Sequence, residues 1–210
     1  MNERYKSMKQ IIILLIAAAS TSCGTSKVYD INKTYDAETI KKIETAGVFA
    51  SNMLIKTLMK NLLEATSDKD YAGAIEFCST EALPLTNSLT ENLNNIVEVK
   101  RTSFKYRNPA NKPDEFEVEA LNYFINEFDS TGWLPDHYLQ GIQKNGLKYA
   151  KYYKPLRVMG LCLNCHGSAA EITPDTRKTI DQIYPDDLAR DYKVKDFRGV
   201  ISIMIDPAGL

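Results

Sequence analysis

The residues best able to do chemistry stand together in one short segment, Leu161-Cys162-Leu163-Asn164-Cys165-His166-Gly167. Two residues separate the thiols, and a histidine follows the second cysteine directly. This C-x-x-C-H spacing is the attachment signature of a c-type haem. Both sulfurs can form thioethers with one haem, while the adjacent imidazole presents a nitrogen to the iron. The segment therefore predicts one covalently bound haem c, held by Cys162 and Cys165, with His166 as an iron ligand.

Three simpler interpretations of the same cysteines compete with this one. A thioredoxin-like C-x-x-C pair belongs to a βαβ unit, and the surrounding pattern is not of that kind. A structural zinc ion needs four ligands, and only the distant Cys78 and His137 remain to complete the set. A local disulfide would explain Cys162 and Cys165 but leaves His166 without a role. Haem attachment is the interpretation that uses all three residues.

The ligand on the opposite side of the iron is open at this point. His137 follows Pro135-Asp136 in a turn that we expect to be exposed, where a single histidine is usually a surface residue. Cys78 lies in an apolar stretch and is the odd thiol of an exported chain, although it could equally be an inert core cysteine. The methionines that could bind instead are Met53, Met59, Met159 and Met204.

The first 22 residues have the pattern of an export signal. Three basic residues, Arg4, Lys6 and Lys9, precede an apolar run at 11–19, small residues and then Cys23. The run is shorter than the ~20 residues that span a bilayer. We expect a signal peptide of the lipoprotein type at 1–22, lipidation of Cys23, a tether at 23–34 and a single domain at 35–210. The protein would be exported to the periplasm and anchored to the membrane by its N-terminal lipid.

Composition excludes several classes of protein. Of 210 residues, 44% are hydrophobic and 25% are charged, which is enough apolar material for one core. The 26 basic and 27 acidic residues leave a formal net charge of −1, with no isolated basic block, so nucleic-acid binding is not expected. Four cysteines are too few for a disulfide-dense scaffold.

Helical spacing of apolar residues dominates the first half of the chain. We expect a long amphipathic helix over 36–64 and a second helix over 71–79, for which Ser67-Asp68 and Asp70 offer N-cap side chains. A third helix is expected over 81–94, interrupted at Pro84. A further helix is expected over 114–128, after a turn at 108–113.

Strand patterns dominate the second half. Residues 97–107 alternate in the manner of a half-exposed strand, and 199–205 form a nearly continuous apolar strand. The segments 138–143 and 147–156 flank Asn145-Gly146, a strong hairpin signal. Helices first and strands around one inserted helix predict an α+β domain with an antiparallel sheet.

Three runs of sequence resemble a known family: AIEFCS (74–79), RTSFKYRNPANKPDEFE (101–117) and YYKPLRVMGLCLNCHG (152–167). The chain is similar, over roughly 36–205, to the PAS-like c-type haem domains, formerly a domain of unknown function. These occur in exported proteins and in the sensory regions of signalling proteins. The resemblance implies a PAS-like antiparallel sheet packed on N-terminal helices, with the haem held by both motif cysteines and the motif histidine. It also implies an axial thiolate from the cysteine that corresponds to Cys78.

Arg101 and Arg107 are candidates for contacts with haem propionates, because a guanidinium fork fits a carboxylate. A solvated strand face is the alternative for each.

The sequence thus predicts an exported monohaem c-type cytochrome that transfers electrons to or from a separate redox partner protein. We do not expect an enzyme, since no nucleophile triad or acid–base pair is visible and six-coordinate iron would block a substrate. The alternative is a stand-alone haem-based redox or gas sensor that acts through a separate partner, an analogy that rests on the PAS-like fold alone.

Overall fold

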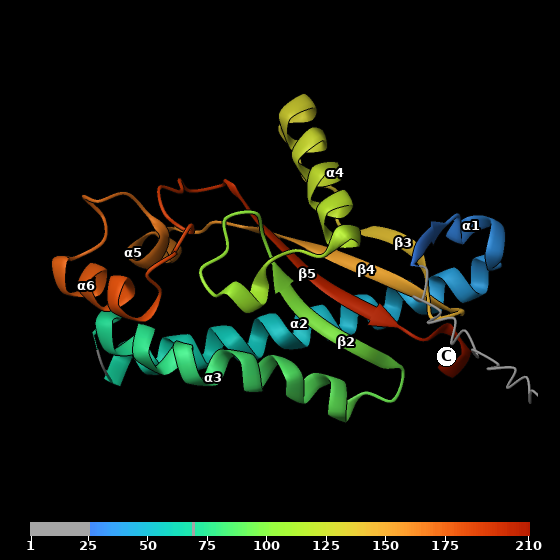
Figure 1. The fold of residues 1–210 in the computed structure, drawn as a ribbon, viewed down its shortest axis with the longest axis horizontal. Helices are drawn as coiled ribbons and strands as arrows, with labels where there is room; N and C mark the ends of the chain where they lie inside the picture. Colours follow the sequence, from blue (N-terminus) through green and yellow to red (C-terminus); the bar gives the residue numbers. More distant parts are fainter. Residues whose placement is uncertain (1–25, 69) are drawn as a thin grey trace, which may run out of the picture.

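The computed structural model describes residues 26–68 and 70–210. Two long helices, α2 and α3, run along one face of a five-stranded sheet, α4 rises from the other face, and the short helices α5 and α6 gather at one end (Figure 1). This confirms the expected α+β class, with its antiparallel PAS-like sheet and long N-terminal helices. In chain order the elements are β1 (Lys27–Tyr29), α1 (Ile31–Thr34), α2 (Ala37–Asp68), α3 (Tyr71–Asn92), β2 (Ile96–Thr102), η1 (Pro109–Asn111), α4 (Glu115–Thr131), β3 (Tyr138–Lys144), β4 (Leu147–Arg157), η2 (Gly160–Cys162), α5 (Leu163–His166), α6 (Pro174–Ile183), β5 (Phe197–Ile205) and η3 (Pro207–Gly209).

The sheet has the strand order β1-β3-β4-β5-β2, and every neighbouring pair is antiparallel. The hairpin between β3 and β4 turns at Asn145 and Gly146, whose φ angles of 53° and 82° suit the primed turn that the Asn-Gly pair predicts. β5 lies inside the sheet between β4 and β2, which explains its almost unbroken apolar sequence.

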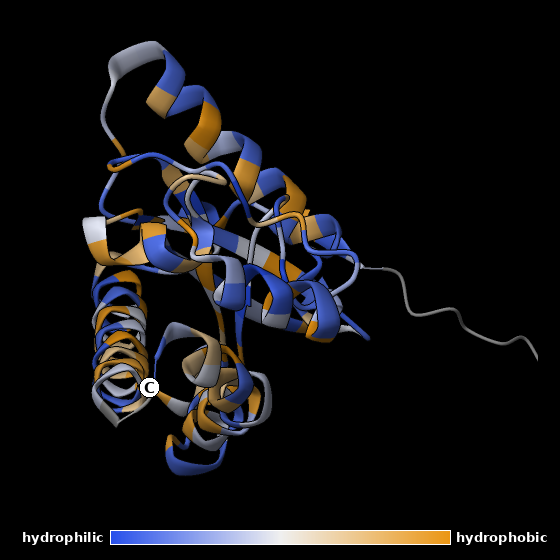
Figure 2. Cartoon of the chain, turned by 90° about the vertical axis from the view of Figure 1, so that its left-hand side faces the viewer, coloured by the Kyte–Doolittle hydropathy of each residue, from blue (hydrophilic) through white to orange (hydrophobic). Residues whose placement is uncertain are grey.

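Acidic side chains start three of the four longest helices. Asp36 accepts the Thr39 N–H at 2.8 Å before α2, and Asp70 accepts the Gly73 N–H at 2.8 Å before α3. Asp114 and Glu117 form a capping box at the start of α4. The helices carry alternating hydrophilic and hydrophobic bands in Figure 2, as expected for helices with one apolar face.

The break expected at Pro84 is wrong, because α3 continues through it from Tyr71 to Asn92. A proline inside a helix costs about 3 kcal/mol. The helix packs against α2, α6 and β2, and it buries residues on both sides of the proline, Ile75 and Leu89 among them. This tertiary packing outweighs the local cost.

The strand expected over 97–107 ends earlier, at Thr102. Beyond that point the backbone leaves the sheet, and the Tyr106 carbonyl accepts the Leu188 N–H at 3.2 Å. Polar and apolar residues still alternate through 103–107. The backbone of this segment, however, no longer pairs with β5 and contacts the loop at Leu188 instead.

Residues 27–34, expected to belong to a tether, are part of the folded domain. β1 pairs with β3, and Ile31 is only 4% exposed within the main apolar cluster. The Tyr29 ring fills the space where a side chain at Gly141 would stand, since a Cβ there would lie 2.5 Å from the ring. The sequence did not predict this strand and helix, because only a few side chains of residues 27–34 are apolar. The signal peptide and Cys23 lie outside the described residues.

The two faces of the sheet are packed differently. Towards α2 and α3 the cluster is apolar and includes Ile43, Leu54 and Tyr152, each fully buried. Under α4 lies a buried ion network in which Lys151 Nζ is 3.0 Å from Asp114 Oδ2 and 3.5 Å from Glu117 Oε1. Lys100 Nζ lies 2.7 Å from the other Glu117 oxygen.

No helix in the described part of the chain is long and apolar enough to cross a membrane.

Replacing Gly47 with Ala tests the packing of α2 on the sheet. Helix propensity alone predicts a gain of up to about 1 kcal/mol in the free energy of unfolding. A Cβ at Gly47, however, would lie 2.2 Å from Cγ of the Tyr152 ring, which is itself fully buried. We therefore expect the free energy of unfolding to fall by roughly 2 kcal/mol in urea titrations, because overpacking dominates. The control Thr45→Ala, on the exposed side of the same helix turn, should change it by less than about 0.5 kcal/mol, and a stabilised Gly47→Ala protein would contradict the packing.

Candidate functional site

The motif cysteines lie in a segment with little regular structure. Cys162 ends the 3-10 turn η2, and Cys165 and His166 belong to the four-residue helix α5. Both cysteines are half-buried free thiols, and the Met159 N–H donates to Cys162 Sγ at 3.3 Å. Gly167 closes the segment, where a Cβ would lie 2.7 Å from the Leu163 carbonyl oxygen and would force the backbone to shift.

His166 is held in one tautomer by a backbone carbonyl. Its Nδ1 lies 2.8 Å from the Ala189 oxygen, so Nδ1 carries the proton that it donates there. Nε2 is then left with a free lone pair. Burial lowers the pKa of His166 well below its usual value, and the charges of Arg198 and Arg107 add to this. A neutral imidazole with a free Nε2 is the form that binds a metal ion.

Arg107 and Asp187 tie the motif to the loop that follows α6. The guanidinium of Arg107 binds both oxygens of Asp187 at 3.1 Å, and its Nη2 donates to the Cys165 carbonyl at 2.6 Å. The Asp187 side chain is fully buried. Its burial would raise the pKa of the carboxyl, but Arg107, the Ala189 amide and Arg190 together hold that pKa below its usual value.

Cys78 faces the same region from α3. Its thiol is half-buried and lies near enough to Cys165, Arg101 and Tyr184 for their charges to interact with it. Burial raises the pKa of Cys78, and the charges of Arg101 and Arg107 partly offset this. The fold thus brings the odd thiol to the motif although 84 to 88 positions separate them in the sequence.

Arg101 differs from Arg107 in its surroundings. It reaches inward from β2, and its Nε is buried without a hydrogen-bond partner among the described residues. Burial lowers the pKa of Arg101, and no carboxylate in the described chain pairs with it. A buried donor without an acceptor is costly, so this one is suited to an acidic group that is not part of the polypeptide.

Arg198 and Tyr192 belong to the site but were not predicted. Tyr192 lies edge-on to His166 with ring centroids 6.3 Å apart, and its N–H donates to the His166 carbonyl at 3.0 Å. The Arg198 guanidinium lies 5.1 Å from the Tyr192 ring and donates to the Lys105 carbonyl at 3.0 Å. No spacing in the sequence connects these residues with the motif, because tertiary folding alone brings them there.

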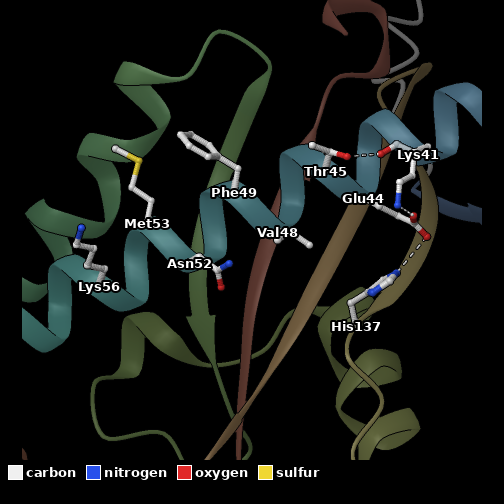
Figure 3. A pocket seen from close by; sticks show the side chains of 9 residues that line it. All are labelled: Lys41, Glu44, Thr45, Val48, Phe49, Asn52, Met53, Lys56 and His137. Carbon is white, nitrogen blue, oxygen red and sulfur yellow. Dashed lines mark hydrogen bonds and ion pairs between the residues drawn. The ribbon is translucent and has the colours of Figure 1, made fainter.

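The other candidate iron ligands are His137 and the four methionines, and none of them is arranged beside His166 as an axial ligand would be. His137 is half-buried rather than exposed: it stacks on Tyr152 at 5.1 Å, and its Nε2 is 3.4 Å from Glu44 Oε1. It lines a groove of about 700 Å³ along α2 that contains none of the motif residues (Figure 3). Met53 lines the same groove, and Met204 is buried with Phe116 and Ile142. Met159 is 51% exposed beside the motif, and Met59 lies on α2.

The alternatives for the motif find little support in this geometry. All strand pairings are antiparallel, so the parallel βαβ unit of a thioredoxin-like site is not formed by the described strands. Within residues 26–68 and 70–210, no three His, Cys, Asp or Glu side chains gather in a way that could hold a metal ion. A haem iron needs only axial ligands from the protein, which His166 and Cys78 are able to supply.

Comparisons with known proteins agree with the resemblance noted in the sequence. A solved structure, the crystal structure of the cyanobacterial heme-protein Tll0287, matches with a TM-score of 0.55 and 21% sequence identity, covering 82% of this chain and 97% of that one. At this identity the match shows a shared fold. No curated protein matches the sequence. The model of the Tll0287-like family, described as Tll0287, matches residues 7–206. This match extends over nearly the whole sequence, so the chain belongs to the Tll0287-like family.

Proposed function

We propose that this protein is a monohaem c-type cytochrome that transfers electrons. The observation that carries the proposal is the arrangement at His166: Nδ1 is bonded to the Ala189 carbonyl, Nε2 is left free, and two free thiols at C-x-x-C spacing precede it. The family relative with a solved structure is described as a heme-protein, which supports the same conclusion.

Each motif residue has a separate role in this proposal. Cys162 and Cys165 hold haem c by thioethers, and His166 binds the iron through Nε2. When bound, the haem supplies a one-electron Fe(III)/Fe(II) couple. Arg101 fits the same group, because its buried Nε has no hydrogen-bond partner among the described residues and a haem carries two propionates. Arg107 has protein partners of its own, Asp187 and the Cys165 carbonyl.

Cys78 is proposed as the second axial ligand. It is the third described thiol and it faces the motif from α3. Burial raises the pKa of Cys78 more than the charges of Arg101 and Arg107 lower it, so a bound iron ion would have to stabilise the thiolate. Two protein ligands leave no open iron position, which suits electron transfer rather than catalysis and limits rearrangement between oxidation states. A sensor in which Cys78 leaves the iron is the competing function.

Export and anchoring complete the proposal. The basic and apolar pattern of residues 1–22 and the position of Cys23 support a lipoprotein that acts in the periplasm at the membrane and exchanges electrons with a separate protein.

Covalent attachment is tested by acid–acetone extraction of the haem. Produced with a cytochrome c maturation system, the protein should keep its haem through acid–acetone extraction, because thioethers resist it. The double variant Cys162→Ser/Cys165→Ser should lose the haem completely, whereas Cys78→Ser should retain it. A colourless wild-type protein that contains zinc would refute the proposal.

Ligation by Cys78 is tested by spectra of Cys78→Ala. The haem should stay attached, while the low-spin ferric spectrum gives way to a high-spin or water-bound one. CO affinity should rise and the reduction potential should increase, since thiolate donation to Fe(III) is lost. His137→Ala is the control and should leave the spectrum unchanged, because His137 lines the groove along α2, with its Nε2 3.4 Å from Glu44 Oε1. If only His137→Ala loses the low-spin spectrum, the iron has two histidine ligands. Rapid CO binding by the reduced wild-type protein would favour the sensor.

Lipidation is tested on protein purified from membranes of the native host. The N-terminal peptide should begin at Cys23 and carry acyl chains, because the small residues before it form the cleavage site. A Cys23→Ser variant should appear in the soluble periplasmic fraction. A wild-type protein cleaved elsewhere and found only in the soluble fraction contradicts the anchor.

A further inference from the structure

One buried carboxylate organises the loop that faces His166. Asp187 accepts two hydrogen bonds from Arg107 at 3.1 Å, one from the Ala189 N–H at 2.9 Å and one from Arg190 Nε at 2.9 Å. Its side chain has no exposed surface. The number of donors that converge on one carboxylate fixes the backbone between 187 and 190.

Ala189 links this carboxylate to the imidazole. Its N–H is held by Asp187, and its carbonyl oxygen accepts the His166 Nδ1 proton at 2.8 Å. The two hydrogen bonds leave the same residue, so a movement of the amide away from Asp187 also displaces the carbonyl from Nδ1.

Arg107 connects the Asp187 loop with the segment that carries His166. While its Nε and Nη2 bind Asp187, Nη2 also donates to the carbonyl of Cys165, the residue that precedes His166. One guanidinium therefore fixes the distance between the loop that carries the acceptor and the segment that carries the imidazole. Only a planar fork with several donors can make both connections, which a lysine cannot reproduce.

We propose that Arg107 and Asp187 are positioning residues that hold the Ala189 carbonyl on Nδ1 of His166, and so fix the tautomer and orientation of the imidazole. The inference rests on the proposed function for its consequence at the iron. A metal-binding histidine takes its orientation and basicity from the partner of its second ring nitrogen. Here that partner is a backbone carbonyl whose place is set by an ion pair reaching from the turn that follows β2.

The ring nitrogens of the histidines give a direct readout. The chain has only two histidines, so ¹⁵N-histidine labelling yields signals from His166 and from His137, which serves as the internal reference. In the reduced wild-type protein we expect His166 to show one tautomer, with the proton on Nδ1 and slow exchange of this proton with solvent.

Two conservative variants test the pair. Arg107→Lys keeps the charge but loses the fork, and Asp187→Asn keeps the size but loses the charge. In each, exchange of the His166 Nδ1 proton should accelerate by roughly tenfold, the change in an opening equilibrium that follows from the loss of one typical hydrogen bond. His137 should be unaffected. In Arg107→Lys the reduction potential should also rise, because a weaker Nδ1 hydrogen bond makes the imidazole a poorer donor while the charge is unchanged.

The control is Arg157→Lys, an exposed arginine at the end of β4 that packs on Phe128 and touches neither Asp187 nor His166. It should leave exchange and potential at wild-type values. If one variant does not fold, the other decides, since either alone breaks the connection. Unchanged exchange and a single Nδ1-H tautomer in a folded Arg107→Lys or Asp187→Asn protein overturn the inference. A wild-type protein without haem would overturn the proposed function instead, because the tautomer and its exchange remain measurable in that protein.

Discussion

The segment that carries both thiols and the imidazole cannot hold its own shape, and much of the surrounding structure compensates for this. It consists of one 3-10 turn and a single turn of helix, which supply few internal hydrogen bonds. Contacts from distant parts of the chain hold it instead. The Asn164 side chain donates to the Tyr71 hydroxyl of α3 at 3.0 Å, and the Gly167 carbonyl accepts the Asp191 N–H at 3.0 Å. The relative positions of thiols and imidazole are thus a property of the whole end of the domain.

The stretch after β2 connects this end of the domain with the core under α4. On one side Lys100 reaches the Lys112 carbonyl at 2.6 Å and Glu117 at 2.7 Å, and the Thr102 hydroxyl donates to the Asn111 carbonyl at 3.0 Å. On the other side Arg107 reaches Cys165. The family-like run at 101–117 therefore spans from a buried ion network to the motif. Breaking a buried ion pair leaves an uncompensated charge that costs about 3–5 kcal/mol, which makes the ion network a firm anchor for this stretch.

Local chemistry decided which features the sequence could predict. The Asp70 cap, the Asn145-Gly146 turn and the apolar β5 depend on neighbouring residues, and the structure agrees with each of them. The continuation of α3 through Pro84 and the end of β2 at Thr102 depend on packing against distant elements, which no local pattern records. Helix α6 was missed although Thr173-Pro174 is a usual N-cap and first-turn pair, because its ten residues carry few apolar side chains.

The same division applies to the site. The sequence alone could identify four site residues, because the reactivity of a thiol or an imidazole is known from the residue type: Cys78, Cys162, Cys165 and His166. Asp187 looks like any acidic loop residue in the sequence, and Ala189 acts through its backbone carbonyl, which every residue possesses. The role of Ala189 therefore depends only on where the fold places its carbonyl oxygen, 2.8 Å from His166 Nδ1. Arg198 could be found only after folding had placed it beside Tyr192.

The site around the motif and Cys78 contains more positively charged side chains than carboxylates. Arg101, Arg107 and Arg198 all act on the motif or on Cys78 from half-buried positions, whereas Asp187 is the one buried carboxylate that pairs with any of them among the described residues. Arg107 is neutralised by that pair, and Arg198 binds a carbonyl and an aromatic face. Arg101 keeps a buried Nε that finds no acceptor among the described residues. A buried excess of cations is unfavourable unless anions balance it. In the proposed function, a thiolate at Cys78 and the haem propionates would supply that negative charge, and their pairing with these arginines would stabilise the bound haem.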